Sequence, residues 1–168
     1  MKLQTKIFCL ALQTTAAAVV AVVLWSTPSY AVARYGAFAD MAGSWSGAGR
    51  IYTMKGAEPL RCRAHYAVAE GAATMRQHLV CASASYRFNV DSSVVERGGN
   101  VSGTWNETNR GVGGQVAGVL RGDRVEAQIH GPSFAANLNL VTRGNTQAVT
   151  IVPQGGDIRE VAVNLRRG

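Results

Sequence analysis

Apolar and polar residues alternate along much of the chain after residue 43. The alternation has a period of two over residues 60–68, 86–90 and 161–166. A period of two is typical of β-strands that bury one face. No window shows the spacing of three to four residues that marks an amphipathic helix. The pattern therefore predicts β-strands, and no helices, for this part of the chain.

Turn-forming residues separate these segments at intervals of about a dozen residues, the spacing of strands joined by hairpins. Residues 43–167 then hold about ten strands. Consecutive strands with short connections most simply form an up-and-down antiparallel meander, and closure into a barrel removes the exposed edges. We predict an all-β fold, with a closed barrel of about ten strands over residues 43–168.

The hairpin registers support this prediction. A two-residue loop at 122–123 places Leu120 opposite Val125, so that an inward residue meets an inward one. A two-residue loop at 144–145 matches its flanking strands in the same way. A slip of one residue would send the two apolar sets to opposite faces, so the agreement supports both loops.

The N-terminal segment has the pattern of a secretory signal peptide. Lys2 and Lys6 precede the apolar run 7–25, and the small-residue site Ala31-Val32-Ala33 follows it. An uncleaved membrane anchor is the alternative, but the cleavage site favours removal. We predict a signal peptide over 1–31, an N-terminal tail over 32–42, no transmembrane anchor after cleavage, and a periplasmic or secreted protein.

Export leaves two of the three cysteines in an oxidising compartment, because Cys9 lies in the signal peptide. Cys62 and Cys81 are expected to form a disulfide. If they lie directly opposite each other, a four-residue loop at 70–73 closes the hairpin, and the cysteines occupy an inward, non-hydrogen-bonded pair that suits a disulfide. The cross-link closes a loop of about 20 residues and should contribute roughly 3 kcal/mol.

The same register places His65 opposite His78 on the outer face. Two imidazoles on adjacent strands could chelate a metal, but a competent site needs three or four ligands. The neighbours that the hairpin identifies include Arg63 and Arg76, which repel cations. We predict a solvated pair and no metal site.

Charge and motifs exclude several classes of function. The chain has 17 Lys and Arg against 10 Asp and Glu, but the arginines are scattered, and no nucleic-acid partner is expected for an exported protein. HExxH, GxSxG, P-loop and CxxC motifs are absent, and the glycine-rich segment 111–118 has no following helix to hold a phosphate. We predict that the protein is not an enzyme and has no catalytic residues.

The predicted barrel interior combines aromatic residues with many small ones. The small residues either make room for a ligand or let large neighbours interdigitate. We predict that the interior binds a small apolar or amphipathic molecule. The alternative is a protein-interaction module or a purely structural envelope protein. The candidate ligand-binding residues are Tyr66, Phe88, Trp105, Phe134 and Leu138.

The first predicted strand begins with Gly43-Ser44-Trp45-Ser46-Gly47-Ala48-Gly49. This segment resembles the Gly-x-Trp opening of calycin barrels such as lipocalins and, more narrowly, the Gly-x-Trp-x-Gly-x-Gly of nitrobindin-like haem barrels. The resemblance implies that Trp45 plugs the closed end of the barrel and stacks on Arg166 or Arg167. Nitrobindin-like barrels bind haem through a histidine near the C-terminus. No histidine follows His130, so we predict no cofactor.

The chain also resembles the periplasmic inhibitors of secreted metalloproteases, small barrels with a Gly-x-Trp followed by a disulfide between early strands. Gly43, Trp45, Cys62 and Cys81 follow that order. The resemblance implies a periplasmic protein partner, with the tail at about residues 32–41 entering the protease cleft.

Overall fold

The structure is a computed structural model that describes residues 36–168; the predicted signal peptide and residues 32–35 of the predicted tail lie outside the described part. A short 3-10 helix, η1, precedes ten strands. No helix in the described part is long and apolar enough to cross a bilayer. The elements are η1 Ala39–Met41, β1 Gly43–Thr53, β2 Gly56–Val68, β3 Thr74–Ala82, β4 Arg87–Arg97, β5 Asn100–Glu107, β6 Val112–Arg121, β7 Arg124–Gly131, β8 Phe134–Arg143, β9 Thr146–Pro153 and β10 Ile158–Arg167.

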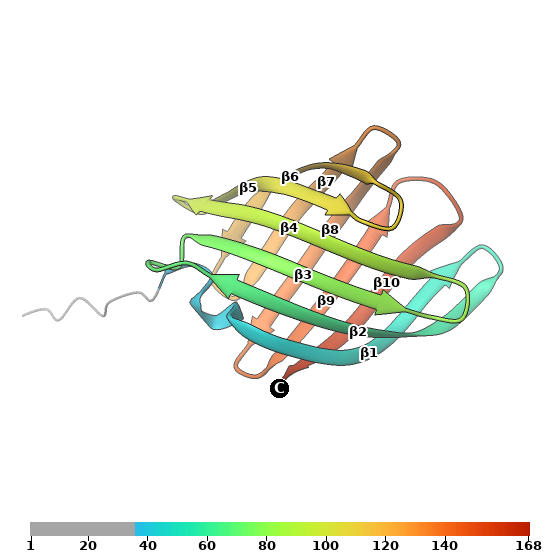
Figure 1. Cartoon of the computed structure of the whole chain (residues 1–168), viewed down its shortest axis with the longest axis horizontal. Coiled ribbons are helices and arrows are strands. Elements are labelled where there is room, and N and C mark those ends of the chain that lie inside the picture. Colours follow the sequence, from blue (N-terminus) through green and yellow to red (C-terminus); the bar gives the residue numbers. More distant parts are fainter. Residues whose placement is uncertain (1–35) are drawn as a thin grey trace, which may run out of the picture. The chain divides into compact units, whose positions relative to one another are not determined.

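The strands form one closed barrel (Figure 1). Each strand pairs antiparallel with the next along the chain, and β10 returns to pair with β1. The predicted all-β, up-and-down barrel is confirmed. Closure leaves no strand edge free to pair with another chain.

The predicted hairpin registers are also confirmed. Leu120 pairs with Val125, and Cys62 pairs with Cys81. The backbone N–H of Ala69 donates to the carbonyl of Thr74 at 3.0 Å, which leaves residues 70–73 as the predicted four-residue loop. Local turn chemistry and side-chain alternation were sufficient for these pairings.

Two of the tight hairpins depend on glycine at the first loop position. Gly122 and Gly144 have φ values of 60° and 55°. This is the left-handed conformation that a type II′ turn requires there, and its twist matches that of the flanking strands.

Inward-facing glycines let neighbouring strands approach closely. A Cβ on Gly47 or Gly49 of β1 would lie 2.0 or 1.9 Å from a backbone carbonyl oxygen of β10. A Cβ on Gly114 of β6 would lie 1.7 Å from a carbonyl oxygen of β7. Glycine commonly marks such tight bends in barrels. These residues thus allow the sheet to coil, a role that neither expectation for the small interior residues had included.

The two ends of the barrel differ in their loops. The end that we call the closed end carries η1 and the loops 69–73, 98–99, 122–123 and 144–145. The opposite end, which we call the open end, carries the loops 54–55, 83–86, 108–111, 132–133 and 154–157. Helix η1 contacts both β2 and β8, two strands that are far apart around the barrel. It therefore lies across the closed end.

Candidate functional site

The closed end is filled by the residues around Trp45. Phe38, Met41 and Trp45 are 1, 3 and 1% exposed. The indole N–H of Trp45 donates to the carbonyl of Met41 at 2.8 Å. The guanidinium of Arg167 lies over the Trp45 ring, 4.6 Å from its centre, and donates to the carbonyls of Ala42, at 2.6 Å, and Asp40. Arg167 thus ties the N-terminal segment to the last strand.

The arginine that covers Trp45 is Arg167 and not Arg166. Trp45 faces inward and pairs with Arg167 across the β1–β10 junction. Because successive side chains of a strand point to opposite faces, Arg166 points outward, and it is exposed. Of the two arginines that the resemblance allowed, Arg167 therefore covers Trp45, and a structural role for Arg166 is wrong.

Tyr66 belongs to the packing of the closed end. Its hydroxyl donates to Oε1 of Gln147 at 2.7 Å, and Nε2 of Gln147 donates to Oγ1 of Thr142 at 3.0 Å. The rings of Tyr66 and Trp45 meet edge to face, with their centres 6.5 Å apart. Burial raises the pKa of the Tyr66 hydroxyl above its usual range, against a smaller opposing effect of its bond to Gln147. The phenol therefore stays neutral and serves as a hydrogen-bond donor.

Several inward-facing apolar side chains nearer the open end are only partly buried. They pack against the core but retain solvent-accessible surface. On β8, Leu140 is buried while Leu138, two residues closer to the open end, is partly exposed. The β1–β2 side is filled, because Ile51 and Leu60 are both fully buried. The partly exposed inward residues include Phe88, Trp105, Leu138, Ile151 and Val161.

Aromatic side chains lie around this partly exposed surface. Tyr86 and Phe88 are stacked with their ring centres 6.2 Å apart, and the Arg110 guanidinium lies 5.6 Å from the centre of Phe88. Trp105 and Phe134 meet edge to face at 5.6 Å. Phe134 is 38% exposed. Four of the five predicted ligand-binding residues thus lie in the open half, whereas Tyr66 lies in the closed half.

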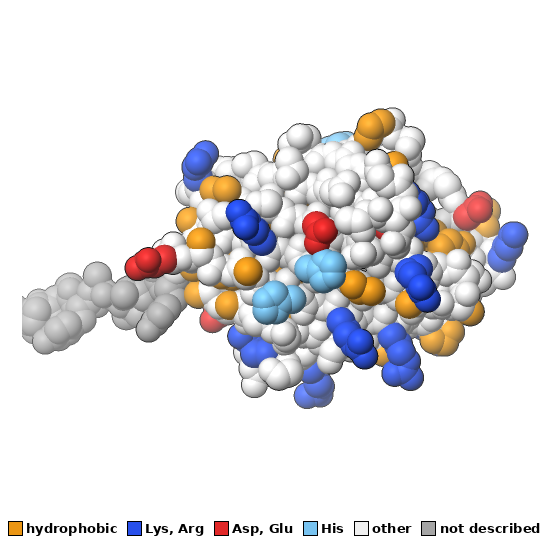
Figure 2. All heavy atoms as spheres, viewed as in Figure 1, with side chains coloured by type: hydrophobic (Ala, Val, Ile, Leu, Met, Phe, Trp, Pro, Cys, Tyr) orange, Lys and Arg blue, Asp and Glu red, His pale blue; other side chains and the backbone are white. Residues whose placement is uncertain are grey.

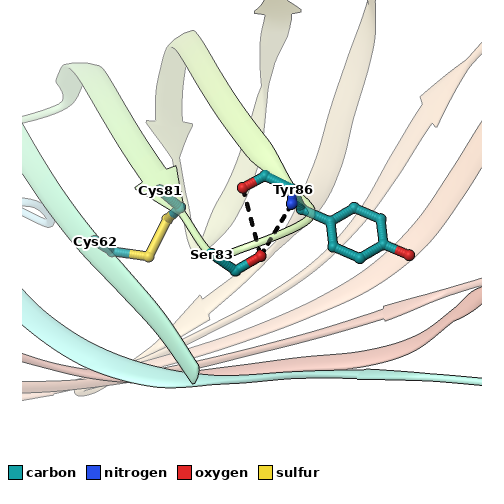
Figure 3. The surroundings of a disulfide bond; sticks show 4 residues. All are labelled: Cys62, Cys81, Ser83 and Tyr86. Carbon is teal, nitrogen blue, oxygen red and sulfur yellow. Dashed lines mark hydrogen bonds between the residues drawn. A yellow bond between two sulfur atoms is a disulfide. The ribbon is translucent and has the colours of Figure 1, made fainter. Parts of the chain in front are cut away.

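The predicted disulfide is present and lies next to this region (Figure 3). Cys62 and Cys81 both face inward, with their Cα atoms 4.1 Å apart. Two residues after Cys81, Ser83 accepts a hydrogen bond from the backbone N–H of Tyr86 at 3.0 Å. The cross-link and this turn together hold the 83–86 loop, and with it Tyr86, at the open end.

A buried carboxylate organises the next loop of the open end. Glu107 is 5% exposed and accepts hydrogen bonds from the backbone N–H groups of Asn89, at 3.0 Å, and Arg110, at 2.8 Å. Desolvation alone would raise the pKa of Glu107, but these bonds outweigh it and hold the pKa below its usual value. Glu107 was missed in the sequence, because nothing in its spacing distinguishes it from a carboxylate at a strand end.

A row of polar side chains crosses the outer face of β1–β4. His65 and His78 are direct cross-strand neighbours, as predicted. Nδ1 of His65 is hydrogen-bonded to Ser44 Oγ at 3.1 Å, and Nδ1 of His78 to Asp91 Oδ1 at 2.6 Å. Figure 2 shows two adjacent histidines and an acidic side chain near the centre of this face. The row borders a surface groove of about 710 Å³.

The residues do not fit a haem held by imidazole, which the nitrobindin resemblance implies. The chain has three histidines, and His65, His78 and His130 all lie on outward positions of their strands and are exposed. Both barrel cysteines are in the disulfide, and the Tyr66 hydroxyl is bonded to Gln147. The open half therefore offers no histidine to hold the iron.

Comparison with known proteins supports the fold. No known family model matches the sequence, and no curated protein is significantly similar to it. Among solved structures, the chain is similar to the crystal structure of Rv2717c from M. tuberculosis, with a TM-score of 0.62 and 15% identity. The match covers 79% of this chain and 95% of that chain. The chain therefore shares the fold of that structure, and here the fold is a closed antiparallel β-barrel.

Proposed function

We propose that this protein is an exported, non-enzymatic barrel that binds a small apolar or amphipathic molecule in its open half. The observation that carries the proposal is the partial exposure of inward-facing apolar side chains there, among them Phe88, Leu138 and Val161. Apolar surface that folding leaves accessible inside a barrel is the surface that a ligand buries with a gain in free energy.

The surroundings of this surface favour an amphipathic molecule. Phe88 and Leu138 offer apolar walls, while Arg110 places a cation above Phe88. The guanidinium also lies 3.3 Å from Glu107, which partly offsets its charge. A ligand with an apolar body and a polar or weakly anionic head matches this combination.

The proposal of a non-enzymatic role is supported by the state of the inward polar groups. Glu107 accepts bonds from two backbone N–H groups, and Tyr66 is neutral and bonded to Gln147. Neither is positioned next to a nucleophile or a partner for proton transfer. Export to the periplasm or medium is supported by the N-terminal pattern and by the disulfide, since disulfides persist in oxidising compartments.

The arrangement of the tail argues against the protease-inhibitor alternative. An inhibitory tail must enter the cleft of its partner. Phe38 and Met41 are instead buried in the barrel, and the backbone N–H of Phe38 donates to the carbonyl of Ala72 at 3.0 Å. Releasing this segment would expose the core of the closed end.

Two neighbouring residues of β9 provide a matched test. Ile151 faces inward, opposite Leu138, whereas Val152 faces outward and is 40% exposed. Titration with palmitate, followed by tryptophan fluorescence, is expected to show saturable binding. Ile151→Gln should weaken it, because a polar group replaces part of the apolar wall, and Val152→Gln should leave it unchanged.

A flat titration with palmitate and with a neutral hydrophobic dye would contradict the proposal. Equal effects of Ile151→Gln and Val152→Gln on palmitate binding would contradict a binding site inside the barrel. Trp105→Phe identifies the reporter, because only Trp45 would then remain in the barrel. The fluorescence change should be lost in that variant, while the affinity measured by calorimetry persists.

A further inference from the structure

The polar row on the outer face consists of four cross-strand neighbours, and their order fixes the hydrogen-bond partner of each histidine. Cross-strand pairing places its members side by side as Ser44, His65, His78 and Asp91. The two histidines occupy the centre, and each has its hydrogen-bond partner on the far side. His65 is bonded toward β1, and His78 is bonded toward β4.

This order determines where the second ring nitrogens point. In an imidazole ring, Nδ1 and Nε2 lie on opposite sides of the Cβ–Cγ axis. Since Nδ1 of His65 turns toward β1, its Nε2 lies on the side of β3. Since Nδ1 of His78 turns toward β4, its Nε2 lies on the side of β2. Both Nε2 atoms therefore lie on the sides of their rings that face the junction between β2 and β3.

The partners also prepare the nitrogens to bind a cation. Metal-binding histidines commonly donate their other ring N–H to a carboxylate or another oxygen, which sets the tautomer and increases the basicity of the ligating nitrogen. Asp91 holds His78 in this way at 2.6 Å, and Ser44 Oγ is the oxygen partner of His65 at 3.1 Å. Asp91 also places a negative charge beside the pair and opposes the repulsion from Arg63 and Arg76.

We propose that His65 and His78 form a two-histidine chelate for a divalent transition metal of the Cu²⁺, Ni²⁺ or Zn²⁺ class, through their Nε2 atoms. Imidazole is a preferred ligand for all three ions. Among residues 36–168 no group of three or more His, Cys, Asp or Glu side chains converges on a metal position. Water or an external donor must therefore complete the coordination.

The neighbouring groove has room for these further ligands. Besides the histidines it is lined by polar side chains such as Asn106 and Gln115. A metal held by two histidines on such a surface keeps open coordination positions, which allow it to bind a second molecule. The sequence predicts a solvated pair without metal, because it does not reveal that Asp91 and Ser44 hold the two rings in opposed orientations.

The test is isothermal titration of untagged protein with CuCl₂, NiCl₂ and ZnCl₂ at pH 7.5. We expect one site per chain, with micromolar affinity and Cu²⁺ bound most tightly. His65→Ala and His78→Ala should each abolish the site. Asp91→Asn should weaken it by about tenfold, because it removes the carboxylate that orients His78.

The third barrel histidine provides the matched control. His130 is also exposed on the outer face, hydrogen-bonded to Gln128 at 3.3 Å, and His130→Ala should leave metal binding unchanged. Circular dichroism would verify that each variant is folded. Absence of binding at millimolar metal would overturn the proposal. So would binding that survives in both His65→Ala and His78→Ala. Both results are independent of the palmitate titration, which concerns the interior.

Discussion

The closed and open ends of the barrel are built from the same alternating strands but bury their inward-facing tryptophans to different degrees. At the closed end Trp45 is 1% exposed, whereas Trp105, which also faces inward, is partly exposed near the open end. The strand pattern only directs a side chain inward. The degree of burial depends on what else packs against the side chain, and at Trp45 this includes η1 and its flanking residues.

The two ends are also stabilised by different means. The closed end combines apolar packing with the Tyr66–Gln147 hydrogen bond and the contacts of Arg167. The disulfide lies in the part of the β2–β3 hairpin nearer the open end, next to the 83–86 loop. Covalent closure adds stability without filling space with side chains, which suits an end that keeps apolar surface accessible.

The largest expected loss tests the closed end directly. Trp45→Ala should lower the free energy of unfolding by about 3–5 kcal/mol, because it removes a fully buried ring from a packed core. Trp105→Ala should cost less, because its ring already contacts water. Urea unfolding of both variants measures the difference, and equal losses would mean that the two ends are packed alike.

The second-largest loss of stability is expected from removing the disulfide. Replacing Cys62 and Cys81 together by Ala should cost about 3 kcal/mol, since the closed loop spans about 20 residues. Thermal or urea unfolding of this variant, compared with that of the oxidised protein, measures the loss. Mass analysis of exported protein under non-reducing conditions should detect no free thiols in this pair. Free thiols would contradict the pairing.

Adjacent arginines on β10 sharpen the comparison further. Arg167→Ala should lower the free energy of unfolding by about 2 kcal/mol. The carbonyls of Asp40 and Ala42 lose their hydrogen-bond donor, and the Trp45 ring loses its contact with the guanidinium. Arg166→Ala, one residue earlier, should change stability by less than about 0.5 kcal/mol, because that side chain points outward. Similar effects of the two substitutions would contradict the assignment of Arg167 to the packing of the closed end.

Alkaline pH should weaken the closed end through Tyr66. Its pKa is raised in the folded state, so its contribution is fully present below the ordinary value of 10.0 and is lost as the pH rises above it and the unfolded chain ionises. The loss approaches about 1.4 kcal/mol per pH unit above that value. Tyr66→Phe should remove this part of the pH dependence. Unfolding at pH 8 and 11 measures it, and identical profiles would contradict the burial of the hydroxyl.

A small effect on stability is expected for an aromatic residue of the open end. Phe134→Ser should change the free energy of unfolding by no more than about 0.5–1 kcal/mol, because the ring is 38% exposed. The same substitution should weaken palmitate binding if Phe134 contacts the ligand. A large loss of stability together with unchanged binding would assign Phe134 to the core.

The sequence by itself determined the strand class, the barrel topology, the hairpin registers and the Cys62–Cys81 pair. The strand class, the hairpin registers and the cysteine pair depend on short-range features, namely side-chain alternation with a period of two and the residues of a tight turn, which can be read within one hairpin. The up-and-down topology follows from joining about ten such strands in series with short connections. The 122–123 loop shows this, since its two strands match face to face without reference to the rest of the chain.

Only the tertiary structure decided which residues complete each site. Whether Arg167 or Arg166 covers Trp45 depends on the pairing register of β10 with β1, two strands from opposite ends of the barrel sequence. The burial of Phe38 depends on the position of η1 against the barrel. Asp91 and Ser44 join the histidine row through strands outside the β2–β3 hairpin. These contacts arise from closure of the barrel, and a shift of one residue in its register changes which side chains face each other. No local pattern specifies that register, because it is determined by all ten strands together.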